Sequence, residues 1–189
     1  MTSFSTARQF PPPSTTLPHL LVDGSDHQFR GMVYDLLSLS AMMLKTRELY
    51  GAYIGVSAPQ YTILMVVAEH GSTTVGRLAA TLHTSGPFIT SEVNKLVKRG
   101  HLRRRPNDTD RRSTYIELTD FGRAEVLKVA PMRTCANDIV FGSLKPAEAA
   151  MFQHLVGAMV KDLERAIHTL EGPDWDRAQS AAASLSEGR

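Results

Sequence analysis

The sequence predicts a mainly α-helical fold that contains one small β-hairpin and has a long helix towards each end of the chain. Three observations indicate this fold. Apolar residues recur at helical spacing over most of the 189 residues, two short extended segments flank a Pro-Asn-Asp turn, and basic residues concentrate around those segments. Because 42% of the residues are hydrophobic, the chain has enough apolar side chains to form a packed core.

Composition excludes several classes of protein. The longest strongly apolar stretch, Ile63 to Ala68, is far shorter than the roughly 18 residues that cross a bilayer. Residues 1–24 are rich in Pro, Ser and Thr and contain no apolar core after a basic start, so they predict a flexible arm and no secretory signal. The single cysteine, Cys135, excludes an internal disulfide framework, and we expect it to be a small buried residue. We therefore expect a soluble, cytoplasmic protein.

The first two helices follow from their caps and apolar spacing. Ser25 is a candidate N-cap for a long amphipathic helix that runs to about Tyr50, where the apolar pattern breaks at Gly51 and Gly55. Ser57 to Gln60 is typical of a capping box with Pro in the first helical turn. Since Tyr61 to Ala68 is apolar on nearly all sides, this second helix should be central, and Gly71 should end it.

A short helix, a tight turn and a second helix come next. Thr74 is expected to cap a helix over Val75 to Leu82, and Ser85 or Gly86 to open another. That helix has an apolar stripe of Ile89, Val93, Leu96 and Val97. Its opposite face is polar and basic: Thr90, Ser91, Asn94, Lys95 and Lys98. This arrangement is typical of a helix-turn-helix.

The hairpin directly follows the second of these helices. Leu102 to Arg105 and Ser113 to Leu118 are predicted strands on either side of turn residues. In the second strand Tyr115 and Glu117 should share one face, while the residues between them share the other. A basic hairpin at this place predicts a winged helix-turn-helix over residues 57–122.

Helices on both sides of this region are expected to form a dimer interface. Thr119 should cap a fifth helix that Pro131 ends or kinks, and a further helix is expected from Lys145 to about Leu170. A last short helix is predicted over residues 174–185. The apolar stripes of the helices in segments 25–56 and 123–189 exceed what a small central region covers, which predicts a partner subunit. The alternative is that both helices pack on their own chain.

Charge is concentrated near the hairpin. Between Lys95 and Arg112 there are eight Lys and Arg residues against two Asp residues, a net charge of +6. Such a one-signed segment favours phosphate as its partner, and hence double-stranded DNA; the alternative is a solvated charged face.

Several stretches of the chain resemble the MarR family of bacterial regulators. They are Ser57-Ala58-Pro59-Gln60-Tyr61, Thr74-Val75-Gly76-Arg77-Leu78-Ala79, Leu96-Val97-Lys98-Arg99-Gly100-His101-Leu102, and Asp110-Arg111-Arg112-Ser113 followed by Glu117-Leu118-Thr119 and Gly122. The sequence departs from the family at His101, where an apolar residue is usual, and at Gly86-Pro87-Phe88, an unusual start for the recognition helix.

The resemblance implies a homodimer that binds an inverted-repeat operator, most simply as a repressor released by a small aromatic or anionic ligand. The residues that it places at DNA are Arg77, Ser85, Pro87, Thr90, Ser91, Asn94, Lys95, Lys98, Arg104, Arg111 and Arg112. Asn94 would pair with adenine, Arg111 would enter the minor groove, and Asp110 would hold the shape of the wing. Because Arg103 to Arg105 alternate along a strand, not all three can face DNA.

The resemblance also implies a ligand pocket where the first, second and fifth helices meet. The residues predicted to line it are Met43, Arg47, Tyr50, Tyr53, Met65 and Arg133. The alternative is that its Met and Tyr residues belong to the core. The zinc-sensing and peroxide-sensing branches of the family do not fit, because the fifth helix contains no histidine and Cys135 is far from the first helix.

The alternatives to a regulator are an enzyme and a protein-interaction module. An enzyme is not expected, because the chain contains no Gly-rich phosphate loop, paired-cysteine motif or nucleophile elbow. No cofactor or metal is expected either. The remaining alternative is a winged helix that serves protein interaction or dimerisation without DNA binding, and the +6 segment argues against it.

Overall fold

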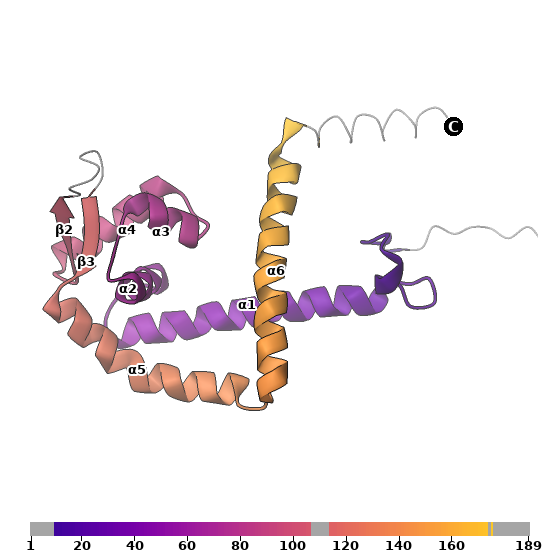
Figure 1. The fold of residues 1–189 in the computed structure, drawn as a ribbon, viewed down its shortest axis with the longest axis horizontal. Coiled ribbons are helices and arrows are strands. Elements are labelled where there is room, and N and C mark those ends of the chain that lie inside the picture. Colours follow the sequence, from indigo (N-terminus) through magenta and orange to yellow (C-terminus); the bar gives the residue numbers. More distant parts are fainter. Residues whose placement is uncertain (1–9, 107–113, 174, 176–189) are drawn as a thin grey trace, which may run out of the picture. The chain divides into compact units, whose positions relative to one another are not determined.

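The computed structural model describes residues 10–106, 114–173 and 175 (Figure 1). Its elements are a 3-10 helix at Pro18–Leu20, α1 (His27–Tyr53), α2 (Ala58–His70), β1 (Ser72–Thr73), α3 (Val75–Thr81), α4 (Gly86–Lys98), β2 (Leu102–Pro106), β3 (Thr114–Leu118), α5 (Asp120–Phe141) and α6 (Pro146–Glu171). The predicted fold class, mainly helical with a small hairpin, is confirmed. In the described part of the chain no single helix has the length and hydropathy to cross a membrane. Among the described residues, only α1 and α2 taken together reach that length and hydropathy, and they are bent by 86° relative to each other.

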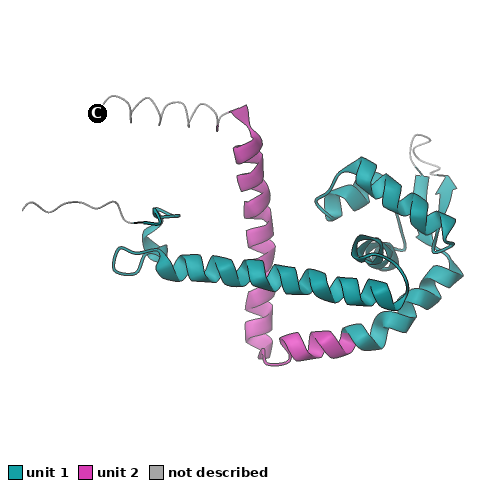
Figure 2. Cartoon of the chain, turned by 180° about the vertical axis from the view of Figure 1, so that it is seen from behind, with its two compact units in different colours: residues 1–133 teal, residues 134–189 magenta. Residues whose placement is uncertain are grey.

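The chain divides into two compact units, Met1–Arg133 and Thr134–Arg189 (Figure 2). The first unit holds α1 to α4, the strands and the first part of α5. The second holds the rest of α5 and α6. The boundary between the units therefore lies within α5.

Local hydrogen bonds explain where the helices of the first unit begin. The Ser57 backbone N–H donates to Gln60 Oε1 at 3.1 Å, and Ser57 Oγ accepts from the Gln60 backbone N–H at 3.4 Å. Thr74 and Ser85 cap α3 and α4 in the same way, through N–H groups three residues on. These three predicted caps are confirmed. Gly71 ends α2 at φ +71°, the left-handed conformation that glycine adopts without strain.

The bounds of α1 differ from the prediction. Its N-cap is Asp26 instead of Ser25, and the helix continues through Gly51 to Tyr53. Gly51 allows a close approach of chain segments, because a Cβ there would lie 2.6 Å from the Val56 backbone oxygen. The glycine therefore lets the loop after α1 pack on the helix and does not mark its end.

The core of the first unit surrounds α2. Tyr61, Ile63, Leu64 and Val67 of this helix are at most 1% exposed, as expected for a central helix. Further buried apolar residues come from the other elements of this unit: Leu78, Ile89, Val93, Leu96, Leu102, Ile116, Leu118 and Val129. Burial of these side chains fixes α4 and the hairpin on one scaffold.

The hairpin belongs to a three-stranded antiparallel sheet of order β1-β3-β2. Leu102 pairs with Leu118 and Arg104 with Ile116, and the predicted alternation of β3 is confirmed by the full burial of Ile116 beside the half-buried Glu117. The strand β1 was not predicted. It has only two residues, too few for an alternating pattern.

The fifth helix excludes one of the two predicted effects of Pro131 and corrects the expectation for Cys135. It begins after Thr119, whose Oγ1 accepts the Gly122 backbone N–H at 3.0 Å, as predicted. However, α5 does not end at Pro131 but extends to Phe141. Cys135 is exposed on it, so the expectation of a buried cysteine was wrong for this chain taken alone. The apolar residues near it, Ile139 and Val140, are exposed as well, which shows that this turn of α5 has no core to enter.

The described part of the N-terminal arm folds against the start of α1. The Ser14 backbone N–H and Oγ donate to Asp26 Oδ2 at 2.6 and 2.7 Å, and Arg30 pairs with Asp26 Oδ1. Val22 and Ser25 pair with each other in an isolated antiparallel β-bridge. The Ser14 backbone N–H, followed by the Ser14 hydroxyl, is the main reason why the pKa of Asp26 is lowered.

Candidate nucleic-acid interface

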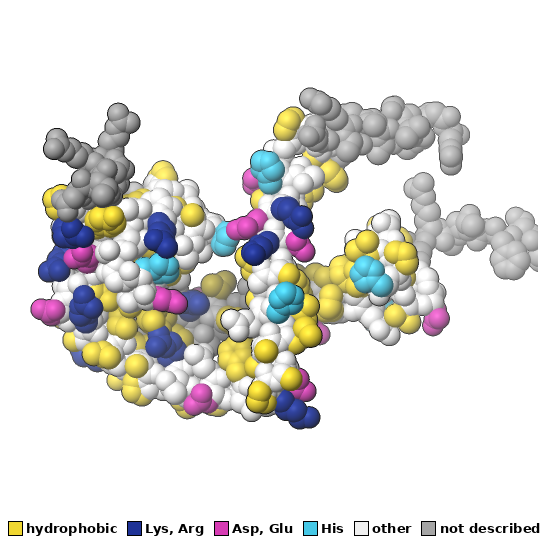
Figure 3. All heavy atoms as spheres, in the orientation of Figure 1, with side chains coloured by type: hydrophobic (Ala, Val, Ile, Leu, Met, Phe, Trp, Pro, Cys, Tyr) yellow, Lys and Arg dark blue, Asp and Glu magenta, His cyan; other side chains and the backbone are white. Residues whose placement is uncertain are grey.

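Helix α4 presents two different faces. Ile89, Val93 and Leu96 are fully buried, which confirms three of the four residues in the predicted stripe, and Val97 is half-buried. The opposite face is open to solvent and polar: Pro87, Ser91, Asn94, Lys95 and Lys98 are exposed, and Thr90 is half-buried. Figure 3 shows Lys and Arg side chains, with some acidic ones among them, over the part of the molecule where Figure 1 places the strands, α3 and α4. The exposed face has the size and chemistry that suit contact with a DNA groove.

Two of the predicted contact residues also form hydrogen bonds with the backbone of the first turn of α4. Ser85 Oγ accepts the Phe88 backbone N–H at 3.3 Å as the N-cap. Thr90 Oγ1 donates to the Gly86 carbonyl oxygen at 2.9 Å. Their hydroxyls therefore contribute to the local structure of the helix start.

A buried carboxylate fixes α4 on α2. Glu92 is 7% exposed, and its Oε2 accepts from Gln60 Nε2 at 2.8 Å. Its other oxygen accepts from Lys95 Nζ at 2.6 Å. The Lys95 ammonium, and then the Gln60 amide, lower the pKa of Glu92 although burial acts to raise it. The network was not predicted; an acidic residue beside the apolar stripe of a basic helix was the signal for it.

The three arginines of β2 leave the strand on different faces, as the alternation predicted. Arg103 Nη2 and Arg105 Nε donate to the two carboxylate oxygens of Glu117 at 3.0 and 2.9 Å. Arg105 and then Arg103 lower the pKa of Glu117. Arg105 also stacks on the Tyr115 ring, with its guanidinium carbon 5.1 Å from the ring centroid.

Arg104 points to the other side of the strand and contacts α4. Its Nη2 donates to Asn94 Oδ1 at 2.7 Å, and both residues are exposed. The structure thus brings together two predicted DNA-binding residues that are ten positions apart. Arg77 is exposed on α3. The predicted wing residues Asp110, Arg111 and Arg112 lie outside the described residues.

The junction between α4, β2 and α5 contains a buried histidine. His101 is 2% exposed, and among the described residues neither ring nitrogen has a hydrogen-bond partner. Its ring packs on Phe121 with the centroids 4.8 Å apart. Its backbone N–H donates to the Leu96 carbonyl at 2.9 Å, and its carbonyl accepts the Thr119 N–H at 3.1 Å. Burial, and then the charge of Arg99, lower the pKa of His101, while Glu125 acts in the opposite direction.

Only some of the residues that were predicted to line a ligand pocket lie close to one another in the structure. The Tyr50 ring packs against Tyr61 at a tilt of 57° with the centroids 5.4 Å apart, and Arg133 Nη1 donates to Met65 Sδ at 3.3 Å. Burial raises the pKa of Tyr61, while Arg133 and then Arg47 act against that rise, so these side chains share one neighbourhood. Met43 and Tyr53 are exposed at 43% and 61%.

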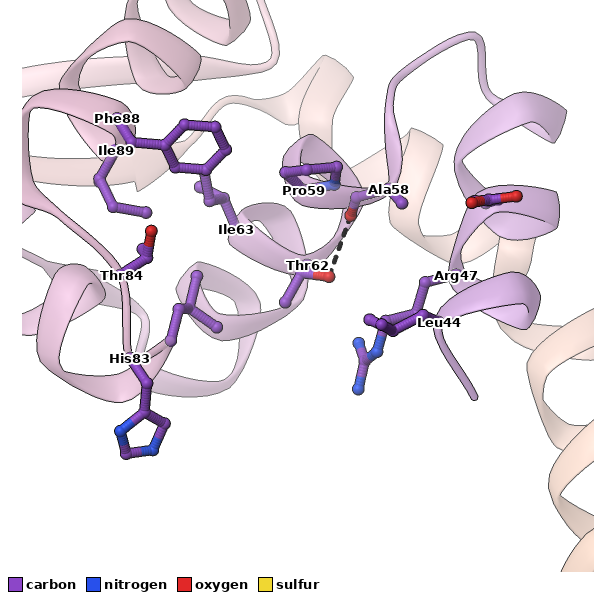
Figure 4. Close-up of a pocket in the computed structure, with 12 residues that line it drawn as sticks. Leu44, Arg47, Ala58, Pro59, Thr62, Ile63, His83, Thr84, Phe88 and Ile89 are labelled. Atoms are coloured by element: carbon purple, nitrogen blue, oxygen red, sulfur yellow. Dashed lines mark hydrogen bonds between the residues drawn. The ribbon is translucent and has the colours of Figure 1, made fainter. Parts of the chain in front are cut away.

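A cavity of about 460 Å³ lies elsewhere in the first unit, between α1, α2 and the turn before α4 (Figure 4). Its wall is mainly apolar, and Arg47 and His83 lie on opposite sides of its opening. Phe88 and Ile89, from the first turns of α4, form part of the lining. Of the residues predicted to line a pocket, only Arg47 takes part in this cavity.

Comparisons with known proteins agree with this geometry. Residues 54–113 match the model of the MarR family. The organic hydroperoxide resistance transcriptional regulator of Bacillus subtilis (strain 168) is 26% identical over 117 residues, which are 62% of this chain and 71% of the relative. An uncharacterized HTH-type transcriptional regulator of the same organism, YwhA, is 26% identical over 52% of this chain and 71% of its own length. Both relatives are named as transcriptional regulators, the class of protein that the sequence predicts for this chain.

Solved structures of similar fold include a MarR family transcriptional regulator from Silicibacter pomeroyi DSS. Its TM-score is 0.66, it is 21% identical in sequence, and the match covers 74% of this chain and 94% of the Silicibacter chain. AbsC from Streptomyces coelicolor has TM-score 0.63 and 20% identity over 76% of this chain and 97% of its own. A mutant of E. coli MarR, solved in complex with operator DNA, has TM-score 0.54 and 21% identity over 68% of this chain and 95% of its own. Residues 54–113 therefore match the MarR family model, and the described part of the chain shares its fold with these solved structures.

Proposed function

We propose that this chain is a sequence-specific DNA-binding transcriptional regulator. The observation that carries the proposal is the division of α4 into a buried apolar stripe and an exposed polar and basic face. A helix that is held on a core by one face and offers hydrogen-bond donors on the other is suited to the major groove. The operator complex of the E. coli relative supports the same use of the fold.

The regulator acts as a homodimer on an inverted repeat. Helix α6 has no buried residue, and its apolar side chains are all 38–61% exposed: Met151, Phe152, Leu155, Val156, Met159, Val160, Leu163, Ile167 and Leu170. An apolar stripe of this length is unfavourable in water, and a second copy of the chain offers the same stripe to cover it. A twofold dimer then presents two α4 helices, which requires a site of two related halves.

The dimer is a repressor that a small ligand releases. The cavity beside α4 supports this step, because an occupant would press on Phe88 and Ile89 and move the start of the recognition helix. The apolar lining with Arg47 at the opening suits an aromatic or aliphatic molecule that carries an anionic group. The alternative of a winged helix without DNA binding is disfavoured by the basic residues on α4 and β2.

We expect DNA binding to weaken steeply with salt, because phosphate contacts release counterions. The affinity for a DNA duplex should be measured between about 50 and about 300 mM salt. In a plot of the logarithm of the association constant against the logarithm of the salt concentration, each phosphate contact should contribute about one to the negative slope. Arg77→Ala and Lys98→Ala should each lower that slope by about one for every sequence tested. Lys161→Ala, an exposed residue of α6, is the matched control and should leave the slope unchanged. An affinity without salt dependence would contradict the proposed function.

A further inference from the structure

Two exposed side chains from different elements form one unit on the surface of α4. Arg104 of β2 pairs across the ladder with the buried Ile116, so it leaves the sheet on the face that packs towards α4. From there its Nη2 donates to Asn94 Oδ1 at 2.7 Å. The neighbouring arginines are held on the opposite face by Glu117. Of its three arginines, the strand therefore delivers the guanidinium of Arg104 to the middle of the exposed face of α4.

The chemistry of the pair fixes which way the asparagine amide points. A guanidinium has five N–H donors and no acceptor, so the amide atom that faces it must be the oxygen. The Nδ2 group of Asn94 is thereby turned away from Arg104 with two N–H donors. Arg104 keeps further donors of its own. Together the two side chains present donors and a positive charge to whatever approaches α4.

A surface of donors discriminates between purines in the major groove. Guanine offers two acceptors there, N7 and O6, whereas adenine offers the acceptor N7 beside the N6 amino donor. Pairing of Asn94 with adenine needs Oδ1 to accept from N6. In this structure Arg104 donates to one of the two lone pairs of Oδ1, and its positive charge disfavours the approach of a second donor, the adenine amino group, to the other.

We propose that Asn94 and Arg104 act as a joint specificity-determining unit that reads guanine, and that Arg104 prevents Asn94 from reading adenine. The unit requires α4 to lie in the major groove, so this inference rests on the proposed function. It changes the base that the sequence alone predicts for Asn94. It also gives Arg104 a role in base choice, whereas Arg103 on the same strand remains bound to Glu117.

The experiment measures affinities for a set of duplexes that differ only in the base pair at each position of one half-site. Wild type should prefer G·C at one position by about tenfold to a hundredfold. Arg104→Ala should shift the preference at that same position towards A·T, because Asn94 Oδ1 then becomes available to the N6 amino group. Asn94→Ala should weaken the preference for G·C without shifting it to another base, because guanine keeps the donors of Arg104, and the double variant should show no preference at that position.

The matched control is Arg103→Ala, which removes the same charge from the same strand but does not touch Asn94. It should leave the base preference at every position unchanged, and thermal unfolding should show that all variants are folded. If Arg104→Ala keeps the wild-type preference, or if the two single variants alter different positions, the joint unit is contradicted while DNA binding stands. If wild type itself binds DNA without sequence preference, the proposed function fails along with the unit.

Discussion

Replacement of Gly122 by alanine should destabilise the protein by about 3 kcal/mol. A Cβ at this position would lie 2.1 Å from the His101 backbone oxygen and 3.1 Å from Leu118 Cδ2. The first turn of α5 would have to move away from β2, which breaks the contact that holds the hairpin to the helix. This cost exceeds the gain of about 1 kcal/mol that alanine brings to a helix.

Urea unfolding followed by circular dichroism measures the effect. Gly76→Ala in α3 is the matched control, because a Cβ there meets no atom within 4 Å. The control should be neutral or slightly stabilising. Equal stabilities of the Gly122 variant and wild type would show that β2 and α5 do not approach as closely as described.

Acid should destabilise the wild type more than a His101→Leu variant. The lowered pKa of His101 means that the folded protein keeps the ring neutral where the unfolded chain already binds a proton. Above the pKa of the unfolded histidine, about 6.5, the ring is neutral in both states and the free energy of unfolding is at its full value. The free energy of unfolding decreases as the pH falls from there towards the pKa of the folded protein. The slope cannot exceed about 1.4 kcal/mol for each pH unit.

Unfolding free energies at pH 7.5, 6.5 and 5.5 test this expectation. The advantage of His101→Leu should increase at each step, and the variant should already be more stable at pH 7.5, because leucine leaves no buried ring nitrogen without a partner. His154→Gln removes a solvent-exposed histidine from α6 and is the matched control. Parallel pH profiles of wild type and His101→Leu would contradict the effect of burial on this histidine.

Features that depend on neighbours in sequence could be predicted. The caps Ser57, Thr74 and Ser85 bond to backbone groups three residues away, so residue type and spacing were sufficient. The buried stripe of α4 follows from the helical period in the same way. The glycine at 51 was misjudged because its role depends on the backbone of Val56, which approaches only after folding.

Features that depend on how elements pack could not be predicted. Alternation along β2 showed that its three arginines could not share a face, but the partners of each depend on the register with β3 and on the position of α4. The bond from Gln60 to Glu92 spans 32 positions and joins two helices. The cavity beside α4 depends on residual space between α1, α2 and a turn, and no periodic pattern encodes that space.

Selection of binding sites from random duplex DNA tests the central claim most directly. The claim is that two copies of this chain read DNA through α4. The selected sequences should contain an inverted repeat whose half-sites have centres about 10 base pairs apart, one helical turn of B-DNA. A single unrepeated site, half-sites with no fixed separation, or no enrichment at all would contradict a dimeric regulator that reads the major groove.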